Sequence, residues 1–108
     1  MQRGEVGWVE FDPAAGSEIR KIRPGIIVSN DSANRNLLRV IVVPLSSNTE
    51  RIYPGEARVS CAGTSSKVMA DQIMTADKAR LKSRIDALSK EDMLAVERAL
   101  QVQLALPK

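Results

Sequence analysis

Short runs of β-branched and other apolar residues, separated by polar turn sequences, constrain this fold more than any other feature of the chain. They predict strands over residues 5–11, 24–29, 37–45, 57–60 and 68–74, followed by a last short strand over 84–88. The β-branched run at residues 40–43 indicates that the third of these is a central strand. Five strands within about 75 residues, joined by short polar connections, are typical of a small barrel.

Prolines and polar clusters mark the ends of these strands. Asp12-Pro13 ends the first strand, and residues 12–22 form a loop that is rich in Pro, Gly and Ser. Pro24 biases the residue before it toward extended geometry. The segment NDSANRN (30–36) predicts a turn, and Pro44 is expected where the central strand leaves the sheet.

Helical signals lie in the last third of the chain. Residues 75–80 predict one helical turn that is capped by Thr75. Ser89 and Asp92 have the spacing of a capping box and predict the start of a longer helix, with Leu88 and Met93 at the spacing of a hydrophobic staple. The stripe that packs this helix on the barrel is Met93, Val96, Leu100 and Leu104. Pro107 is expected to stop it.

The size and hydropathy of the chain bound its class. Its 108 residues suit one compact domain, so we expect a single domain over residues 1–108. No apolar stretch approaches the roughly 20 residues needed to cross a bilayer. The N-terminal segment lacks the basic-then-apolar pattern of a secretory signal. These features predict a cytoplasmic protein that does not enter a membrane.

The chain has no histidine and a single cysteine, Cys61. Histidine most often transfers protons near neutral pH, so its absence excludes His-dependent triads and His-pair nucleases. One cysteine cannot form an intramolecular disulfide, and without histidine there is no basis for a zinc cluster. We therefore expect no metal and no cofactor, and we interpret Cys61 as a small apolar residue in or near a strand.

Arginine and hydroxyl groups remain as candidates for chemistry. Arg23 stands at the start of a strand, and its planar guanidinium suits a phosphate through two hydrogen bonds. Ser46, Ser47 and Asn48 follow the central strand and reach the same end of the sheet if the two strands pair antiparallel. RNA supplies its own nucleophile, the 2′-hydroxyl, so a cation and a hydroxyl can align it and stabilise charge on phosphorus without a metal. Such a site suits RNA better than DNA.

The net charge of +3 is concentrated in one segment. Residues 67–84 carry five basic and two acidic side chains, a local charge of +3, and the flanking segments cancel. The basic residues are Lys67, Lys78, Arg80, Lys82 and Arg84. They could attract backbone phosphates, although a solvated surface is the commoner meaning of such a run.

Five successive segments resemble the MazF/PemK toxins, which are sequence-selective mRNA endoribonucleases (mRNA interferases) of bacterial toxin–antitoxin pairs. The segments are GEVGWVEFDPAAGSE, IRPGIIVSND, VVPLSSN, ADQIMTADKARL and LSKEDMLAVERAL, in order over nearly the whole chain. The Arg-Pro and Asp-Gln-Ile segments are the most specific. The resemblance implies a mainly β fold with α, an SH3-like small barrel with a C-terminal helix. It also implies a homodimer that cleaves single-stranded RNA without metal.

The resemblance further implies roles for individual residues. It places the catalytic arginine on Arg23 and the catalytic hydroxyl on Ser46, where the family usually has threonine; Ser47 is the neighbouring alternative. Serine keeps the hydroxyl but lacks the methyl that restricts its rotamer. The residues predicted to contact RNA are Glu18, Lys21, Ser47, Asn48, Gln72 and Lys78. Trp8 and Tyr53 remain as aromatics for base stacking.

Other interpretations stay open. Arg23 could form an ordinary surface salt bridge, for example to Glu18, and Ser46 and Ser47 could be simple turn formers. A CcdB-like gyrase poison would act through an aromatic at the end of its C-terminal helix, whereas this chain ends LALPK. A catalytically inactive SH3-like binding module is a third class. For the toxin interpretation, the expected partner is an antitoxin whose acidic or amphipathic segment folds over residues 67–84.

Overall fold

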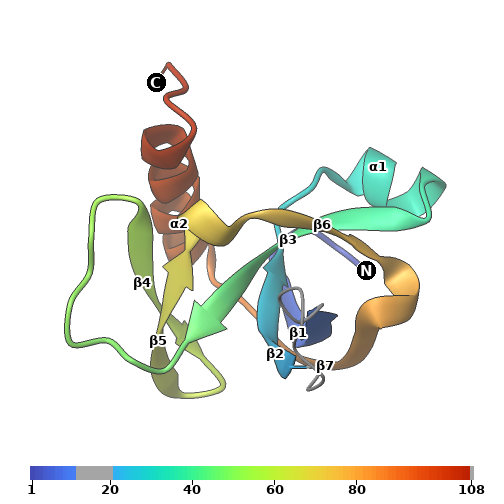
Figure 1. Ribbon diagram of the computed structural model, residues 1–108, viewed down its shortest axis with the longest axis horizontal. Coiled ribbons are helices and arrows are strands. Elements are labelled where there is room, and N and C mark those ends of the chain that lie inside the picture. Colours follow the sequence, from blue (N-terminus) through green and yellow to red (C-terminus); the bar gives the residue numbers. More distant parts are fainter. Residues whose placement is uncertain (12–20, 108) are drawn as a thin grey trace, which may run out of the picture.

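An antiparallel sheet curls into a small barrel in this computed structural model, which describes residues 1–11 and 21–107 (Figure 1). The described elements, in chain order, are β1 (Glu5–Phe11), β2 (Lys21–Ile27), α1 (Asp31–Asn36), β3 (Arg39–Ser46), β4 (Glu56–Cys61), β5 (Thr64–Met69), the 3-10 helix η1 (Ala70–Gln72), β6 (Met74–Asp77), the 3-10 helix η2 (Lys78–Arg80), β7 (Leu81–Ala87) and α2 (Lys90–Gln103). Helix α2 packs beside β4. The predicted fold class, mainly β with a C-terminal helix, is confirmed.

Strand β3 is the centre of the sheet, whose order is β4-β5-β3-β2-β1-β7, with β6 also paired to β3. One edge of β3 pairs with β2, and the other edge pairs first with β6 and then, at Leu45 and Ser46, with β5. Pro44 lies between the β6 and β5 pairings, where the ladder is interrupted and a missing N–H is tolerated. The prediction that the strand leaves the sheet at Pro44 is wrong, because β3 continues to Ser46 and pairs with β5 after the proline.

A side chain joins the two ends of the strand order, β4 and β7. The β4–β5 hairpin turns at Ala62 and Gly63, whose φ values of +49° and +77° suit a two-residue hairpin loop. The backbone N–H of Ala62 donates to Asp86 Oδ2 on β7 at 2.7 Å. This contact brings the tip of the hairpin against the far edge of the sheet.

Apolar residues form two buried clusters on opposite faces of the sheet. The first, which we call the inner core, lies between the barrel strands and α2 and includes Val6, Ile26, Val68 and Val96. The second includes Val9, Phe11, Ile27, Val40 and Val42. Alternation along β1 explains why Val6 and Val9 belong to different clusters. A Cβ at Gly25 would lie 2.9 Å from Val9 Cγ2, so the residue after Pro24 must be small.

The predicted turn at 30–36 is wrong, because these residues form the short helix α1. The Asn30 side chain accepts from the N–H of Ala33 at 2.8 Å and caps it. Polar residues that favour turns also favour helix N-termini, so a run of them does not separate the two outcomes.

Two predictions between residues 68 and 80 are also wrong. The strand predicted over 68–74 begins earlier, at Thr64, ends at Met69 and is followed by η1. Thr75 lies inside β6 opposite Ile41 and does not cap a helix; the helical turn that follows is η2. Pairing with the free edge of β3 overrides the local helical preference of this segment. Strand β7 begins at Leu81, three residues before the predicted start.

Helix α2 begins as predicted, since Ser89 Oγ accepts from the N–H of Asp92 at 3.1 Å. Met93, Val96 and Leu100 pack against the inner core. The stripe is shorter than predicted, because Leu104 is the C-cap and is 46% exposed. The helix ends at Gln103, before Pro107. Within the described ranges, neither this helix nor α1 has the length and apolar character needed to cross a membrane.

Candidate functional site

The inner core opens at one end of the barrel into a pocket of about 360 Å³, which we call the barrel mouth. Its described lining is Trp8, Arg23, Pro24, Leu45, Ser46, Ser47, Cys61, Ala62, Thr64, Ser66 and Ile85. The alternation of side chains along each strand explains why Trp8 and Ser66 line the mouth. Trp8 lies two residues after buried Val6, and Ser66 lies two residues before buried Val68, so each shares the inward face of its strand. At the mouth, several strands carry polar or aromatic side chains on the inward face that is aliphatic deeper in the barrel. Barrel mouths are common ligand sites.

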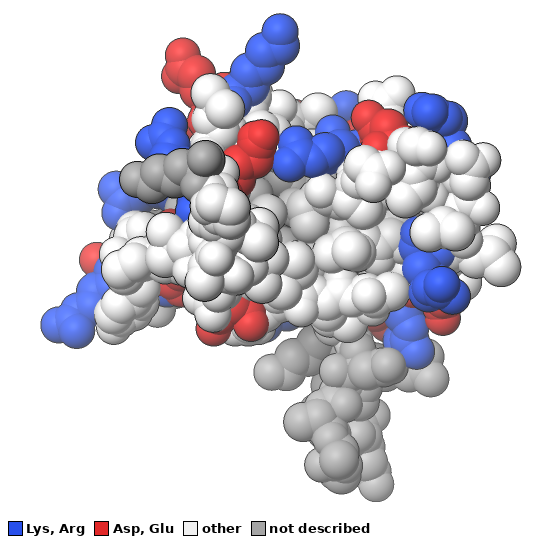
Figure 2. All heavy atoms as spheres, turned by 90° about the horizontal axis from the view of Figure 1, so that it is seen from above, with Lys and Arg blue, Asp and Glu red and all other residues white. Residues whose placement is uncertain are grey.

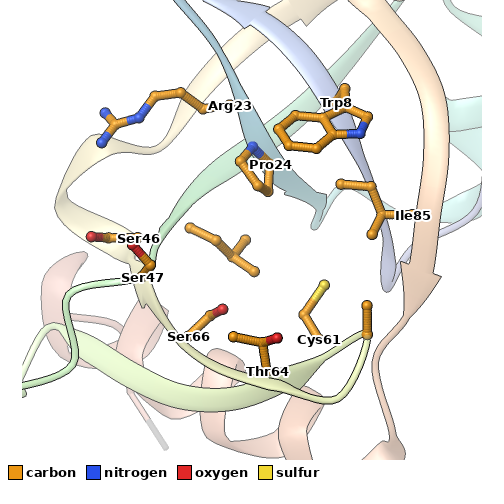
Figure 3. Close-up of a pocket in the computed structure, with 11 residues that line it drawn as sticks. Trp8, Arg23, Pro24, Ser46, Ser47, Cys61, Thr64, Ser66 and Ile85 are labelled. Atoms are coloured by element: carbon orange, nitrogen blue, oxygen red, sulfur yellow. The ribbon is translucent and has the colours of Figure 1, made fainter.

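Arg23 and Ser46 come to the same end of the sheet, as the sequence predicted. Strands β2 and β3 are antiparallel with Gly25 opposite Pro44, and two more residues along this register bring Arg23 level with Ser46. Both residues line the barrel mouth (Figure 3). The half-buried Arg23 forms no ion pair with any residue that the structure describes.

Hydrogen bonds between side chains and the backbone order the segment that follows Ser46. The Ser46 Oγ accepts from the N–H of Asn48 at 3.1 Å, and Asn48 Oδ1 accepts from the N–H of Glu50 at 3.3 Å. Arg58 Nη2 donates to the carbonyl of Thr49 at 2.9 Å. Because Ser46 Oγ uses a lone pair for Asn48, its hydroxyl proton is available to an acceptor in the mouth. Ser47 also lines the mouth and is exposed.

Two residues predicted to contact RNA lie away from the barrel mouth. Gln72 is exposed in η1, and its Nε2 contacts Met69 Sδ at 3.6 Å. Lys78 begins η2, where its N–H donates to the carbonyl of Leu38, next to the start of β3, whereas Ser46 ends that strand. Neither lines the mouth, and their contacts with RNA stay predictions. Glu18, and the side chain of Lys21, lie outside the described residues.

Acidic neighbours offset most of the local positive charge of residues 67–84. The ion pairs are Lys67 with Glu56 at 3.4 Å, Arg80 and Lys82 with Glu10 at 4.0 and 3.9 Å, and Arg84 with Glu5 at 2.7 Å. Figure 2 shows Lys and Arg side chains in separate groups that are intermixed with Asp and Glu on the face it presents. The segment is therefore not an unpaired basic stripe, although its composition suggested one.

Sequence reasoning missed Thr64 and Ser66, which line the barrel mouth from β5. The available signal was the TSSKV run, in which alternate hydroxyl residues lead to a buried valine. Cys61 is buried at the end of β4, as expected, and also lines the mouth. Burial, and secondarily the carboxylate of Asp86, raises the pKa of the Cys61 thiol, so the thiol stays neutral.

No group of three or more His, Cys, Asp or Glu side chains in the described part of the chain could hold a metal ion. The chemical groups in the barrel mouth are one guanidinium, hydroxyls, an indole and a thiol.

A family model for the PemK-like, MazF-like toxins of type II toxin–antitoxin systems matches residues 2–104. The chain belongs to this toxin family. The toxin is 36% identical to endoribonuclease MazF9 of Mycobacterium tuberculosis over 98% of both chains. It is 32% identical to endoribonuclease EndoA of Bacillus subtilis, over 98% of this chain and 96% of the relative.

Solved structures agree with this assignment. The toxin resembles a mycobacterial endoribonuclease in complex with its cognate antitoxin with a TM-score of 0.82 and 29% identity, covering 100% of this chain and 98% of the other. A MazF from Deinococcus radiodurans matches with a TM-score of 0.81 over 97% and 96% of the two chains; at 24% identity, this likeness shows the fold alone. The predicted family and fold are confirmed.

Proposed function

We propose that this toxin is an endoribonuclease that cleaves single-stranded RNA at preferred sequences, without a metal ion, through attack of the 2′-hydroxyl on the scissile phosphate. The observation that carries the proposal is the convergence of Arg23 and Ser46 on one barrel mouth. The relatives named above as endoribonucleases support the same reaction class.

Arg23 is proposed to bind the scissile phosphate. A guanidinium offers two parallel N–H donors to phosphate oxygens and keeps its charge at any physiological pH. As the 2′-oxygen approaches phosphorus, charge builds on the non-bridging oxygens, and a fixed cation stabilises it more than it stabilises the starting diester. The position of Arg23 in the lining of the barrel mouth supports this role.

Ser46 is proposed to donate a hydrogen bond from its hydroxyl to a non-bridging phosphate oxygen. The reaction forms a bond from O2′ to phosphorus and breaks the bond from phosphorus to O5′. The 2′-hydroxyl loses one proton and O5′ gains one, so the products are a 2′,3′-cyclic phosphate and a 5′-hydroxyl. Neither step needs an external nucleophile, and the protein has only to align the ribose and stabilise charge.

A cognate antitoxin is the proposed protein partner. The mycobacterial structure that contains its cognate antitoxin supports this pairing. RNA cleavage that is undiminished in a saturated toxin–antitoxin complex would contradict an antitoxin that covers the site.

We also propose a homodimer, because exposed apolar side chains gather where α1 meets β3: Leu37 is 47% exposed, Leu38 82% and Ile41 39%. Sedimentation equilibrium tests the dimer.

The decisive test incubates the purified toxin with a long defined RNA in excess chelator and maps the fragment ends. Wild type is expected to give discrete cuts that end in 2′,3′-cyclic phosphates. Arg23→Ala is expected to lose about 100-fold or more in rate, as when a single charge-stabilising donor is removed. Arg98→Ala, an exposed arginine of α2, is the matched control and should cleave normally. Intact RNA with a toxin that still arrests cell growth would contradict the nuclease and favour a gyrase poison or binding module.

A further inference from the structure

Half of the barrel mouth is not used by the proposed phosphate chemistry. Figure 3 shows Arg23 and Ser46 toward one side of the hollow and Trp8 with Ile85 toward the other. Thr64 and Ser66, from the β4–β5 hairpin, face Trp8 across the pocket. We call the part between Trp8 and these hydroxyls the inner half.

No charged side chain among the described residues lines the inner half. Among the described lining residues, Arg23 is the one charged side chain, and it lies at the other side of the mouth. The thiol of Cys61 is buried, and Leu45 and Ile85 contribute apolar surface. A phosphate or a carboxylate would be desolvated here without a partner, which is costly. The inner half therefore suits a neutral ligand.

Trp8 gives this neutral site a planar face. The indole is 41% exposed, although Val6, on the same face of β1, is fully buried. Large aromatic side chains exposed at the edge of an apolar pocket are typical stacking platforms for the bases of single-stranded RNA.

The hydroxyls opposite Trp8 can read the edge of a planar ligand. Thr64 and Ser66 share the face of β5 that carries buried Val68, so they point toward the interior of the mouth. A hydroxyl donates one hydrogen bond and accepts two, which lets it pair with either polar group on a base edge.

The wall that carries these hydroxyls is held in place at its tip and along β4. Asp86 on β7 accepts from the N–H of Ala62 at 2.7 Å, and Asp92 on α2 accepts from the N–H of Ser60 at 2.9 Å. Two other elements of the fold therefore fix the hairpin before any ligand arrives. Fixed recognition groups bind with less loss of conformational entropy.

We propose that the inner half binds the nucleobase next to the scissile phosphate, with Trp8 as its stacking platform and Thr64 and Ser66 as the hydroxyls that read its edge. This inference rests on the proposed RNA cleavage, because a phosphate held by Arg23 brings its neighbouring base to the same pocket. It makes the β4–β5 hairpin a determinant of cleavage specificity.

The first test uses the fluorescence of Trp8, which is the only tryptophan in the chain. A random-sequence pool of 2′-O-methyl RNA cannot be cleaved by its own 2′-oxygen, and its binding should quench the indole. Anisotropy of a labelled 2′-O-methyl pool should show roughly 5- to 150-fold weaker binding for Trp8→Leu, the range for loss of one stacked base. Trp8→Phe should recover most of the affinity.

The second test maps cleavage sites for Thr64→Val and Ser66→Ala. Each removes one hydroxyl and should change the sequence preference at one position while cleavage continues. Ser65→Ala, on the opposite face of the same strand, should leave the preference unchanged.

The two proposals fail in different ways. Cleavage by wild type, without quenching and with preferences unchanged in Thr64→Val and Ser66→Ala, would overturn the subsite and leave the nuclease intact. The opposite result is that RNA quenches Trp8 fluorescence and Trp8→Leu binds RNA more weakly, but wild type cleaves no RNA. This result would overturn the nuclease and support a base-binding pocket.

Discussion

Ser46 of β3 lies directly opposite Lys67 of β5 in an antiparallel pair. Lys67 Nζ also donates to the carbonyl of Arg51 at 3.3 Å, pairs with Glu56 at 3.4 Å and lies 5.9 Å from the centre of the Tyr53 ring. The Lys67 side chain thus links β5, at the position opposite Ser46, to the far end of the segment that begins at Ser47. The conformation of that segment is tied to the candidate active site.

Replacement of Lys67 by Met should therefore destabilise the toxin. Both partners of the Lys67–Glu56 pair are only 12% exposed, so the variant leaves a poorly solvated carboxylate without its cation. We expect a loss of about 1–3 kcal/mol in the free energy of unfolding, measured by urea denaturation. Lys82→Met is the matched control, since that lysine is 46% exposed, and it should cost under about 0.5 kcal/mol. Equal losses in both variants would contradict the anchoring role.

Ser46→Thr should keep RNA cleavage close to the wild-type rate. Threonine retains the hydroxyl that is proposed to contact the phosphate and restricts its rotamer. Ser46→Ala should lose about 100-fold or more in single-turnover rate. Ser47→Ala is the control at the adjacent hydroxyl. A large loss in Ser47→Ala, with Ser46→Ala nearly normal, would move the catalytic hydroxyl to Ser47.

Asp86 should make the stability of the toxin depend on acid pH. Hydrogen bonds from the backbone N–H groups of Ala62 and Ala87, and then the charge of Arg84, lower the Asp86 pKa from its ordinary value of 3.8. The Asp86 carboxyl therefore binds a proton less readily in the folded state than in the unfolded state. Its contribution to the stability of the fold is complete above the unfolded pKa and is lost as pH falls through the folded pKa. Melting temperatures between pH 5 and about pH 2 should fall less steeply in Asp86→Asn than in wild type. Parallel curves would show that Asp86 does not contribute.

Asn34 should be essential for docking α1 on the barrel. It is 2% exposed; its side chain accepts from Ser29 Oγ and donates to the Ser29 carbonyl at 2.9 Å, and Ser29 Oγ accepts from the N–H of Ile41 at 3.0 Å. Asn34→Ala leaves buried polar groups without partners and should cost about 1–3 kcal/mol of unfolding free energy. Asn36→Ala, on the same helix but exposed, should cost under about 0.5 kcal/mol. Thermal melts of the two variants that coincide would contradict this network.

Local signals predicted β1 and α2 well. The apolar alternation of residues 5–11 and the serine cap at 89 act within a few residues of the element they specify. By contrast, the prediction failed for residues 64–80, where β5 and β6 are set by their partners. Ser66 and Lys67 have weak strand signals of their own, and their pairing with β4 and β3 puts them in a strand.

The sequence by itself determined the class of fold, the long helix and its cap, and, through its resemblance to a toxin family, the two residues most closely tied to the proposed chemistry. Only the tertiary structure decided which other residues share a pocket with Arg23: it brought in Trp8 and Thr64, and it left Lys78 near the opposite end of β3 from Ser46. It also paired most of the basic residues of 67–84 with glutamates from β1 and β4. The reason is physical: antiparallel pairing joins residues that are tens of positions apart, and its register depends on the whole sheet and not on any single strand.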